Sequence, residues 1–414
     1  MATEIVELKK GRNSFSLTGR LRITPNSFTL DKVSESGFTS NRAYIGVDCG
    51  DGNIVYAQMF DGYNDRKKLF IHGSKLDDAG KKVDDFTDKM EVEWRDRFNE
   101  DVLEEAGPQC FVKIGLQKRD DGKLKVVRYL SEYDAINYLY EIFKDMPSEE
   151  RDKIVVNVSG DLSYNYYEGK VKVQKNIRSI SAVDVAESAF KAEFTQTVYA
   201  NKDSIGKADL QTNTMPLSVY VPEYVGKYKG TDVKATVPLP FDMTLDCSQS
   251  HADAAKYIAT TIASSSNFCR ATIIGTFKEL GNTEQIDINK LDPQIRMAIQ
   301  TGCISVEEIE MIAAQGSSRV QQMFINGVRV YKDDSNEEEV DINKKMRIDV
   351  EANVYKESEL IDLAGNFMKI VTEVDAGDNK AEAVVSNGTE NTDGVAPFDT
   401  SESEVDLSWL KNFA

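Results

Sequence analysis

Basic and aromatic side chains alternate with apolar ones along one hairpin-like stretch of this sequence, residues 154–180. Lys170 and Lys172 alternate with Val171 and Val173 there, and three tyrosines come shortly before them. Amines on one face of a sheet can follow a phosphate backbone, and any base can stack on an aromatic ring. The stretch therefore predicts a surface for single-stranded nucleic acid. The alternative is a solvent face of lysines over ordinary sheet aromatics, and these residues alone favour neither.

Two segments nearer the N-terminus show the same alternation. Residues 15–23 place Arg20 and Arg22 opposite an apolar face, and residues 41–49 place Arg42 and Tyr44 opposite another. A third predicted strand, 54–60, follows a turn rich in Asp and Gly. The predicted nucleic-acid-binding residues are Arg20, Arg22, Arg42, Tyr44, Tyr56, Phe60, Tyr164, Tyr166, Lys170, Lys172 and Lys175.

The elements that must position these side chains follow a recognisable order. Three strands come first, then a helix over 131–144 that Ser131 and Asp134 begin as a capping box, then the two strands of the hairpin. This βββαββ order is that of an OB-fold, a five-stranded barrel. An insertion at about 64–129 interrupts it; helical spacing of apolar residues predicts a helix within 84–106, and 111–129 reads as a basic hairpin.

A second series of elements begins near residue 190. Strands are predicted at 192–200, 215–224 and 233–245, a helix from Ser250, and further strands at 268–277 and 324–331, with short helices from 292 and 305. We therefore predict an α+β, mainly β protein made of tandem OB-fold-like five-stranded barrels with inserted helices. The predicted domains are 1–185 and 186–374, followed by a tail at 375–414.

The net charge of −19 is distributed unevenly. Residues 375–414 hold nine carboxylates against two lysines, whereas 170–180 hold four cations and no acid. A local basic stripe on an acidic protein is therefore permitted.

The predicted tail is acidic, poor in apolar residues and flexible, except at its end. Large apolar groups there predict a motif that binds a partner protein, made of Phe398, Trp409, Leu410 and Phe413. The alternative is a terminal helix that packs back on its own domain.

Motifs of common enzymes are missing from the sequence. There are only two histidines, neither in a zinc-binding pattern, and no phosphate-binding glycine loop or nucleophile elbow. Five scattered cysteines without a CxxC pair predict reduced thiols, and no apolar run is long enough to cross a membrane. We therefore expect a soluble cytoplasmic protein that is not an enzyme and needs no metal or cofactor.

The combination of Arg20, Arg22, Arg42, Tyr44 and Tyr56, the hairpin and the acidic tail resembles the single-stranded-DNA-binding proteins of tailed bacteriophages. Two short sequence segments, 46–50 and 130–134, are similar to segments of phage proteins of this kind. The resemblance implies a barrel that coats single strands during replication or recombination in the host cytoplasm, and a tail that recruits replication proteins. The competing class is a phage inhibitor or assembly factor whose barrels present loops to other proteins. The choice between DNA and RNA stays open.

Overall fold

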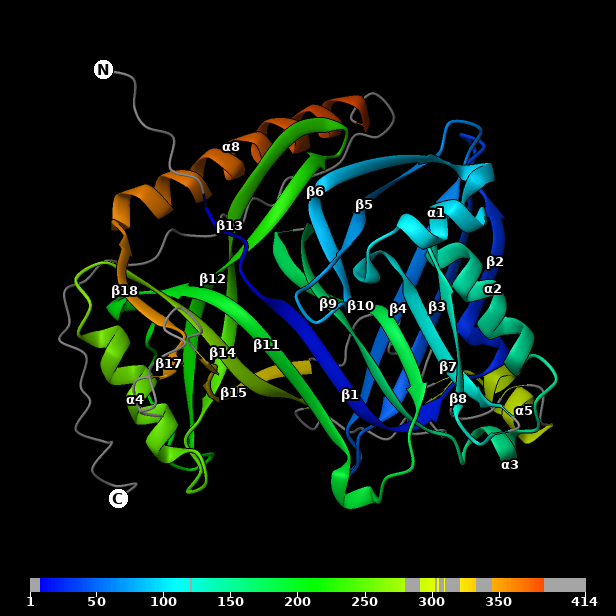
Figure 1. Cartoon of the computed structure of the whole chain (residues 1–414). Helices are drawn as coiled ribbons and strands as arrows, with labels where there is room; N and C mark the ends of the chain where they lie inside the picture. Colours follow the sequence, from blue (N-terminus) through cyan, green and yellow to red (C-terminus); the bar gives the residue numbers. More distant parts are fainter. Residues whose placement is uncertain are drawn as a thin grey trace.

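The computed structural model describes residues 8–119, 121–167, 169–279, 291–301, 304, 309, 321–332 and 345–382. The fold is mainly β, as predicted, and most of its strands belong to one large sheet. Figure 1 shows the N-terminal half in blue and cyan on the right and the later strands in green on the left. One cluster of buried apolar side chains runs through both halves.

Five strands of the N-terminal half form a closed ring of pairings, here called the first ring. Its members are β1 (Asn13–Arg22), β3 (Thr39–Asp48), β4 (Ile54–Tyr63), β10 (Lys170–Ala182) and β9 (Val155–Tyr167), in spatial order. Four pairings are antiparallel, and the ring closes through one parallel contact between Gln58 of β4 and Asn176 of β10. Helix α2 (Glu132–Phe143) lies between β4 and β9 in sequence and buries its apolar side in the core.

Five later strands form a second ring with the same connectivity. In spatial order they are β11 (Lys191–Ala200), β12 (Thr214–Tyr228), β13 (Thr231–Asp246), β15 (Gln321–Val328) and β14 (Phe268–Glu279). The pairing of β13 with β15 is again parallel, at Thr244 and Phe324, and the others are antiparallel. Helix α4 (Ala252–Ala263) again lies between the third and fourth strands in sequence.

Strand β1 joins the two rings because its edges pair with strands of both. One edge pairs with β9; the other pairs first with β11, up to Thr18, and then with β3, from Arg20 onward. Gly19 lies where the partner changes, and a Cβ atom there would be 2.0 Å from the carbonyl oxygen of Asp48. Only glycine permits this close approach of the two backbones.

Helix α2 begins at the predicted residue, but the contacts at its N-terminus differ from those of the predicted capping box. The Ser131 hydroxyl accepts a hydrogen bond from the Tyr133 amide and donates one to Asp61. Asp134 makes a two-point contact with Arg97 at 2.7 and 3.1 Å, so it does not complete the predicted capping box. The cap predicted at Ser250 is wrong, because α4 begins after His251, which makes no side-chain cap.

The insertion contains a hairpin that the helical spacing of apolar residues failed to predict. Strands β5 (Lys68–Leu76) and β6 (Lys82–Glu93) pair as a separate two-stranded sheet, and only α1 (Glu100–Glu105) is α-helical within 84–106. Leu69, Ile71 and Val92 bury the inner side of this hairpin in a small core of its own. The predicted basic hairpin is present as β7 (Val112–Lys118) and β8 (Leu124–Tyr129).

The remaining elements extend or cover the two rings. They are β2 (Phe28–Val33), α3 (Ser148–Arg151), α5 (Pro293–Gln300), β16 (Val330–Lys332), β17 (Met346–Ile348), β18 (Val350–Tyr355), α8 (Glu357–Glu382) and five short 3-10 turns, η1 (Pro25–Ser27), η2 (Trp94–Asp96), η3 (Pro108–Cys110), η4 (Glu187–Ala189) and η5 (Lys202–Ser204). Figure 1 shows α8 lying along the arm formed by β12 and β13. Of the helix predicted from 305, only residue 309 is among the described residues, and it is helical. No helix within the described ranges is long and apolar enough to cross a membrane.

Candidate nucleic-acid interface

Two tyrosines stack on the outer surface of the β3–β4 hairpin. Tyr44 and Tyr56 have ring centroids 5.2 Å apart and planes 8° apart. The register places Gly46 opposite Tyr56, and a Cβ at Gly46 would approach the Tyr56 ring to 3.0 Å. The missing side chain therefore lets the Tyr56 ring lie close to the strand. The outward orientation predicted for both tyrosines is confirmed; the role of Gly46 was not predicted.

Arg42 and Phe60 form a second pair on the same surface. They are direct cross-strand partners, and the Arg42 guanidinium lies 5.3 Å from the centre of the Phe60 ring. The Phe60 side chain is 48% exposed. Arg42 forms no ion pair with any carboxylate that the structure describes, so its charge is available to an incoming anion.

Two amide side chains lie where β4 meets β10, next to the aromatic pairs. The Gln58 Nε2 donates to the Asn176 Oδ1 at 3.4 Å, and the Asn176 Nδ2 donates to the Ser163 hydroxyl at 2.8 Å. Amides offer both donors and acceptors to the edges of bases. Sequence reasoning missed both residues, although alternation along β4 puts Gln58 on the face that carries Tyr56 and Phe60. We call Arg42, Tyr44, Tyr56, Gln58, Phe60 and Asn176 the aromatic face.

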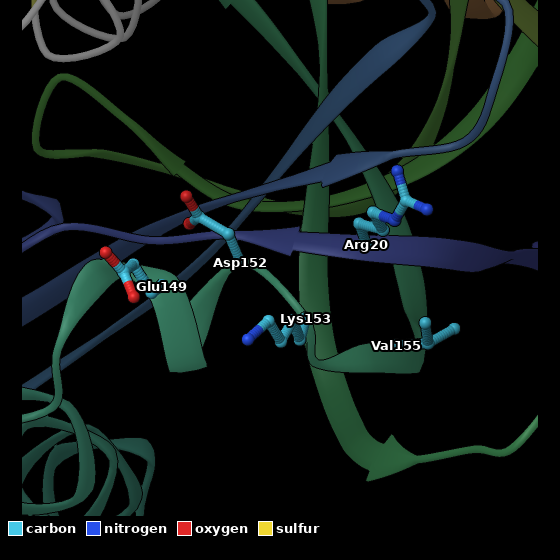
Figure 2. Close-up of a pocket in the computed structure, with 5 residues that line it drawn as sticks. All are labelled: Arg20, Glu149, Asp152, Lys153 and Val155. Atoms are coloured by element: carbon cyan, nitrogen blue, oxygen red, sulfur yellow. The ribbon is translucent and has the colours of Figure 1, made fainter.

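Arg20 and Arg22 lie on the outer side of β1, but carboxylates already neutralise both. Arg22 Nη2 lies 2.9 Å from Asp48 Oδ2, and Arg20 forms an ion pair with Glu187. Arg20 also lines a hollow with Glu149, Asp152, Lys153 and Val155 (Figure 2). The hollow contains two carboxylates and two cations, so it does not concentrate positive charge.

The tyrosines that were predicted to face solvent on the β9–β10 hairpin lie on its inner side. Tyr164 and Tyr166 pair with Val173 and Val171, which places both rings on the inner side of the hairpin. Tyr164 is 1% exposed and its hydroxyl donates to Gln196 at 3.2 Å. The prediction that Tyr164 stacks on bases is therefore wrong.

Tyr166 packs between the two rings instead of facing solvent. Its ring makes edge contacts with Tyr228 of the β12–β13 arm and with Phe367 of α8. Lys170 and Lys172 are exposed as predicted, and their aromatic neighbour is Tyr167, whose ring lies 5.1 Å from the Lys172 Nζ.

Lys175 is buried, which corrects its assignment to a phosphate contact. Alternation from Val171 and Val173 puts Lys175 on the inner face, a signal that the sequence already contained. The side chain is 7% exposed, and its Nζ lies 4.8 Å from the centre of the Phe277 ring in β14. Burial lowers the pKa of this lysine to about 8.

The predicted partner-binding residues Phe398, Trp409, Leu410 and Phe413 lie outside the described residues. Their role stays a prediction.

A cysteine, a histidine and an aspartate meet in the insertion, but their geometry does not suit catalysis. His72 Nε2 lies 2.8 Å from Asp84 Oδ1, and the Cys110 sulfur lies 3.5 and 3.6 Å from the two ring nitrogens. Similar distances to both nitrogens put the sulfur over the ring face, and burial raises the pKa of the thiol, which disfavours the nucleophilic thiolate. No group of metal-binding side chains was found within the described ranges.

Comparisons with known proteins give little further information. No protein-family model and no curated protein matches the sequence. A crystal structure of a deletion mutant of the single-stranded DNA binding protein from Thermus aquaticus aligns with a TM-score of 0.27 and 11% identity, over 66% of this chain and 88% of that one. The wild-type protein from the same organism aligns with a TM-score of 0.25 and 10% identity, over 66% and 87%. These TM-scores are too low for either structure to support an assignment of fold or function.

Proposed function

We propose that this protein binds single-stranded DNA on the aromatic face. The observation that carries the proposal is the stacked Tyr44–Tyr56 pair beside the Arg42–Phe60 pair, on one outward sheet surface where the two tyrosines are half-buried and Arg42 and Phe60 are exposed. Rings supply stacking platforms for bases of any sequence, and an unpaired guanidinium supplies a contact for phosphate. Lys170, Lys172 and Tyr167 continue this chemistry at the tip of the β9–β10 hairpin.

We propose that each ring is an OB-fold barrel, with domains at 1–185 and 186–374. The order of strands in both rings, the parallel closing contact and the position of the helix support this proposal. OB-folds bind oligonucleotides on the face of their second and third strands. In the first ring these strands are β3 and β4, which carry most of the aromatic face.

The second ring does not repeat this surface, so we propose one binding face per chain. Outward positions in 216–218 of β12 and 240–244 of β13 carry Pro216, Ser218, Pro240, Asp242 and Thr244 instead of cations. The Ser218 hydroxyl donates to Asp242 at 2.7 Å. The exposed Lys227 and Lys234 of these strands lie toward the other end of the arm, where both form ion pairs with Asp232. The stretch with Asp242 therefore disfavours phosphates.

The first test is direct binding. We expect the full-length protein to bind labelled dT oligomers more tightly than duplex of equal length, because duplex hides its bases from the rings. Fluorescence anisotropy at low and moderate salt measures both affinities, and mixed-sequence oligomers serve as the control for sequence preference. Equal affinity for duplex, or no binding to dT at low salt, would contradict the proposal. An RNA oligomer in the same assay decides between the two nucleic acids.

We further propose that the chain acts in phage replication or recombination in the cytoplasm of the host cell, where its tail recruits replication proteins. The tail was predicted from residue 375, but α8 extends to Glu382 and Asp375 pairs with Lys229 at 2.9 Å. The segment proposed to act as the tail is therefore 383–414, which holds six carboxylates against one lysine.

Removing 383–414 is expected to raise the affinity for single-stranded DNA, most clearly at low salt. Tethered carboxylates compete with phosphates for a cationic surface at millimolar effective concentration, and salt screens this competition. Anisotropy titrations of the truncated and full-length proteins measure the change. A full-length variant with these six acids changed to Asn or Gln is the matched control. If neither variant binds DNA more tightly, the tail does not compete for the site.

A further inference from the structure

The β7–β8 hairpin is strongly cationic and lies outside the aromatic face. Residues 111–129 hold six cations and two acids, on a protein whose net charge is −19. The cations are Lys113, Lys118, Arg119, Lys123, Lys125 and Arg128. Such a concentration of like charge is costly to the fold through self-repulsion, unless an anion from outside meets it.

None of these six side chains forms an ion pair with a carboxylate among the described residues. By contrast, Arg178 of β10 contacts Glu132 at 3.0 Å and Asp161 at 3.1 Å. Within the hairpin, Asp121 accepts a hydrogen bond from the Lys123 backbone amide, and Arg128 lies over the Phe111 ring. The hairpin therefore presents charge that the described part of the protein does not neutralise.

The hairpin belongs to the same outer surface as the aromatic face. Strand β7 pairs in parallel with the end of β10, and Lys113 lies directly beside Ser179. Across the hairpin, Lys113 pairs with Arg128 on the outward side, whereas Val112 and Ile114 are buried on the inner side. Lys125 lies on the other side of β8, and its partner Gln117 accepts a hydrogen bond from Tyr138 of α2. Lys113 and Arg128 consequently extend the outward surface of β10 beyond Asn176.

These positions form a track along β10, in which the Arg178–Asp161 ion pair lies next to Asn176. Lys170 and Lys172 lie at one end, Asn176 and the aromatic face in the middle, and the β7–β8 hairpin at the other end. Strand β7 continues in the direction of β10, so at a rise of ~3.3 Å per residue the track is roughly 40 Å long. The track is longer than the aromatic face alone. A single DNA strand that is too long for the aromatic face would therefore reach the β7–β8 hairpin.

We propose that the β7–β8 hairpin is a phosphate-binding extension that contacts the backbone of single strands longer than the aromatic face can hold. This inference rests on the proposed function. The outer side of the hairpin carries charges without aromatic rings, so it binds the phosphodiester backbone and adds affinity according to the length of the strand.

The test compares two lengths of dT, one of about 6 and one of about 20 nucleotides. The variant is Lys113→Glu/Arg128→Glu, which reverses the two cations that lie on the outward side next to β10. A milder Lys113→Gln/Arg128→Gln variant removes the charges without reversing them. The matched control is Lys207→Glu/Lys256→Glu, which changes the net charge equally at exposed lysines of the second ring.

We expect the Glu variant to lose affinity for the long oligomer and to keep its affinity for the short one. The slope of log affinity against log salt should become less steep by about 1.4 for the long oligomer, at ~0.7 for each phosphate that the variant no longer neutralises. The Gln variant should show the same flattening of the slope with a smaller loss of affinity, and the control should match the wild type. Unchanged long-oligomer binding would overturn the inference and make the hairpin a charged edge that prevents aggregation. A wild type that binds neither oligomer would overturn the proposed function itself.

Discussion

Replacing both Tyr44 and Tyr56 by alanine is expected to weaken binding of single-stranded DNA by about 30-fold or more, since stacking contributes about 1–3 kcal/mol per base. No charge changes, so the slope of affinity against salt should stay the same and the whole curve should shift in parallel. Anisotropy titrations with dT at several salt concentrations measure both quantities. A parallel shift identifies the rings, rather than the cations around them, as the groups responsible for the missing affinity.

The matched control keeps the rings and removes only the hydroxyl groups. Tyr44→Phe/Tyr56→Phe is expected to bind nearly as tightly as the wild type, because stacking depends on the ring face. Urea unfolding of all three proteins confirms that the surface substitutions leave the fold intact. If the alanine variant binds like the wild type, or the phenylalanine variant loses as much affinity, the aromatic pair is not a stacking platform.

Replacing Lys175 by methionine is expected to stabilise the protein at pH 7, by about 1–3 kcal/mol. The buried ammonium has a pKa of about 8 in the folded chain, lowered by loss of hydration from its ordinary value of 10.5. Below pH 8 the lysine is charged in both states, so the folded protein bears the whole cost of burying it. The contact with the Phe277 ring offsets part of this cost, which sets the lower limit of the range.

The stability difference between Lys175→Met and the wild type is expected to depend on pH. Between about pH 8 and pH 10.4 the unfolded chain holds a proton that the folded chain has released, so the stability of the wild type rises with pH. The advantage of Lys175→Met is therefore full at pH 7 and shrinks as the pH approaches 10. Urea titrations at pH 7, 8, 9 and ~10 measure it, with Lys172→Met as the exposed control.

Lys175→Met should also leave DNA affinity unchanged, in contrast to Lys172→Met. A variant that is less stable than the wild type at every pH would show instead that the ammonium has a strongly stabilising partner. A loss of DNA affinity without a loss of stability would return Lys175 to the binding surface.

Local alternation was sufficient to predict which side of a strand faces solvent. It placed Arg42, Tyr44 and Tyr56 outward correctly, because the period of two is a property of the strand itself. The same rule applied to Val171, Val173 and Lys175 points the lysine inward. The wrong assignment of Lys175 to a phosphate contact was therefore avoidable. The order of strands in the first half was also readable, because each strand is bounded by clear turn residues.

Contacts between distant parts of the chain could not be read in this way. Arg20 meets Glu187 of the connection between the two rings, and Tyr166 meets Tyr228 of β12 and Phe367 of α8, through packing of segments far apart in the sequence. The β5–β6 hairpin was missed for a related reason. Its apolar residues fit either a helix or a strand over a short window, and the pairing that decides between them is not local.

The shared strand β1 constrains how the chain is assembled during synthesis. The first ring can close once residue 182 has left the ribosome, since all five of its strands are then available. The edge of β1 from Asn13 to Thr18 still lacks its partner β11 until residue 196 has emerged. An unpaired edge of this kind is a template for association with other chains. The two domains proposed to meet at 185 would therefore be separate in topology but not in folding, because the first ring is left with an open strand edge until β11 has been made.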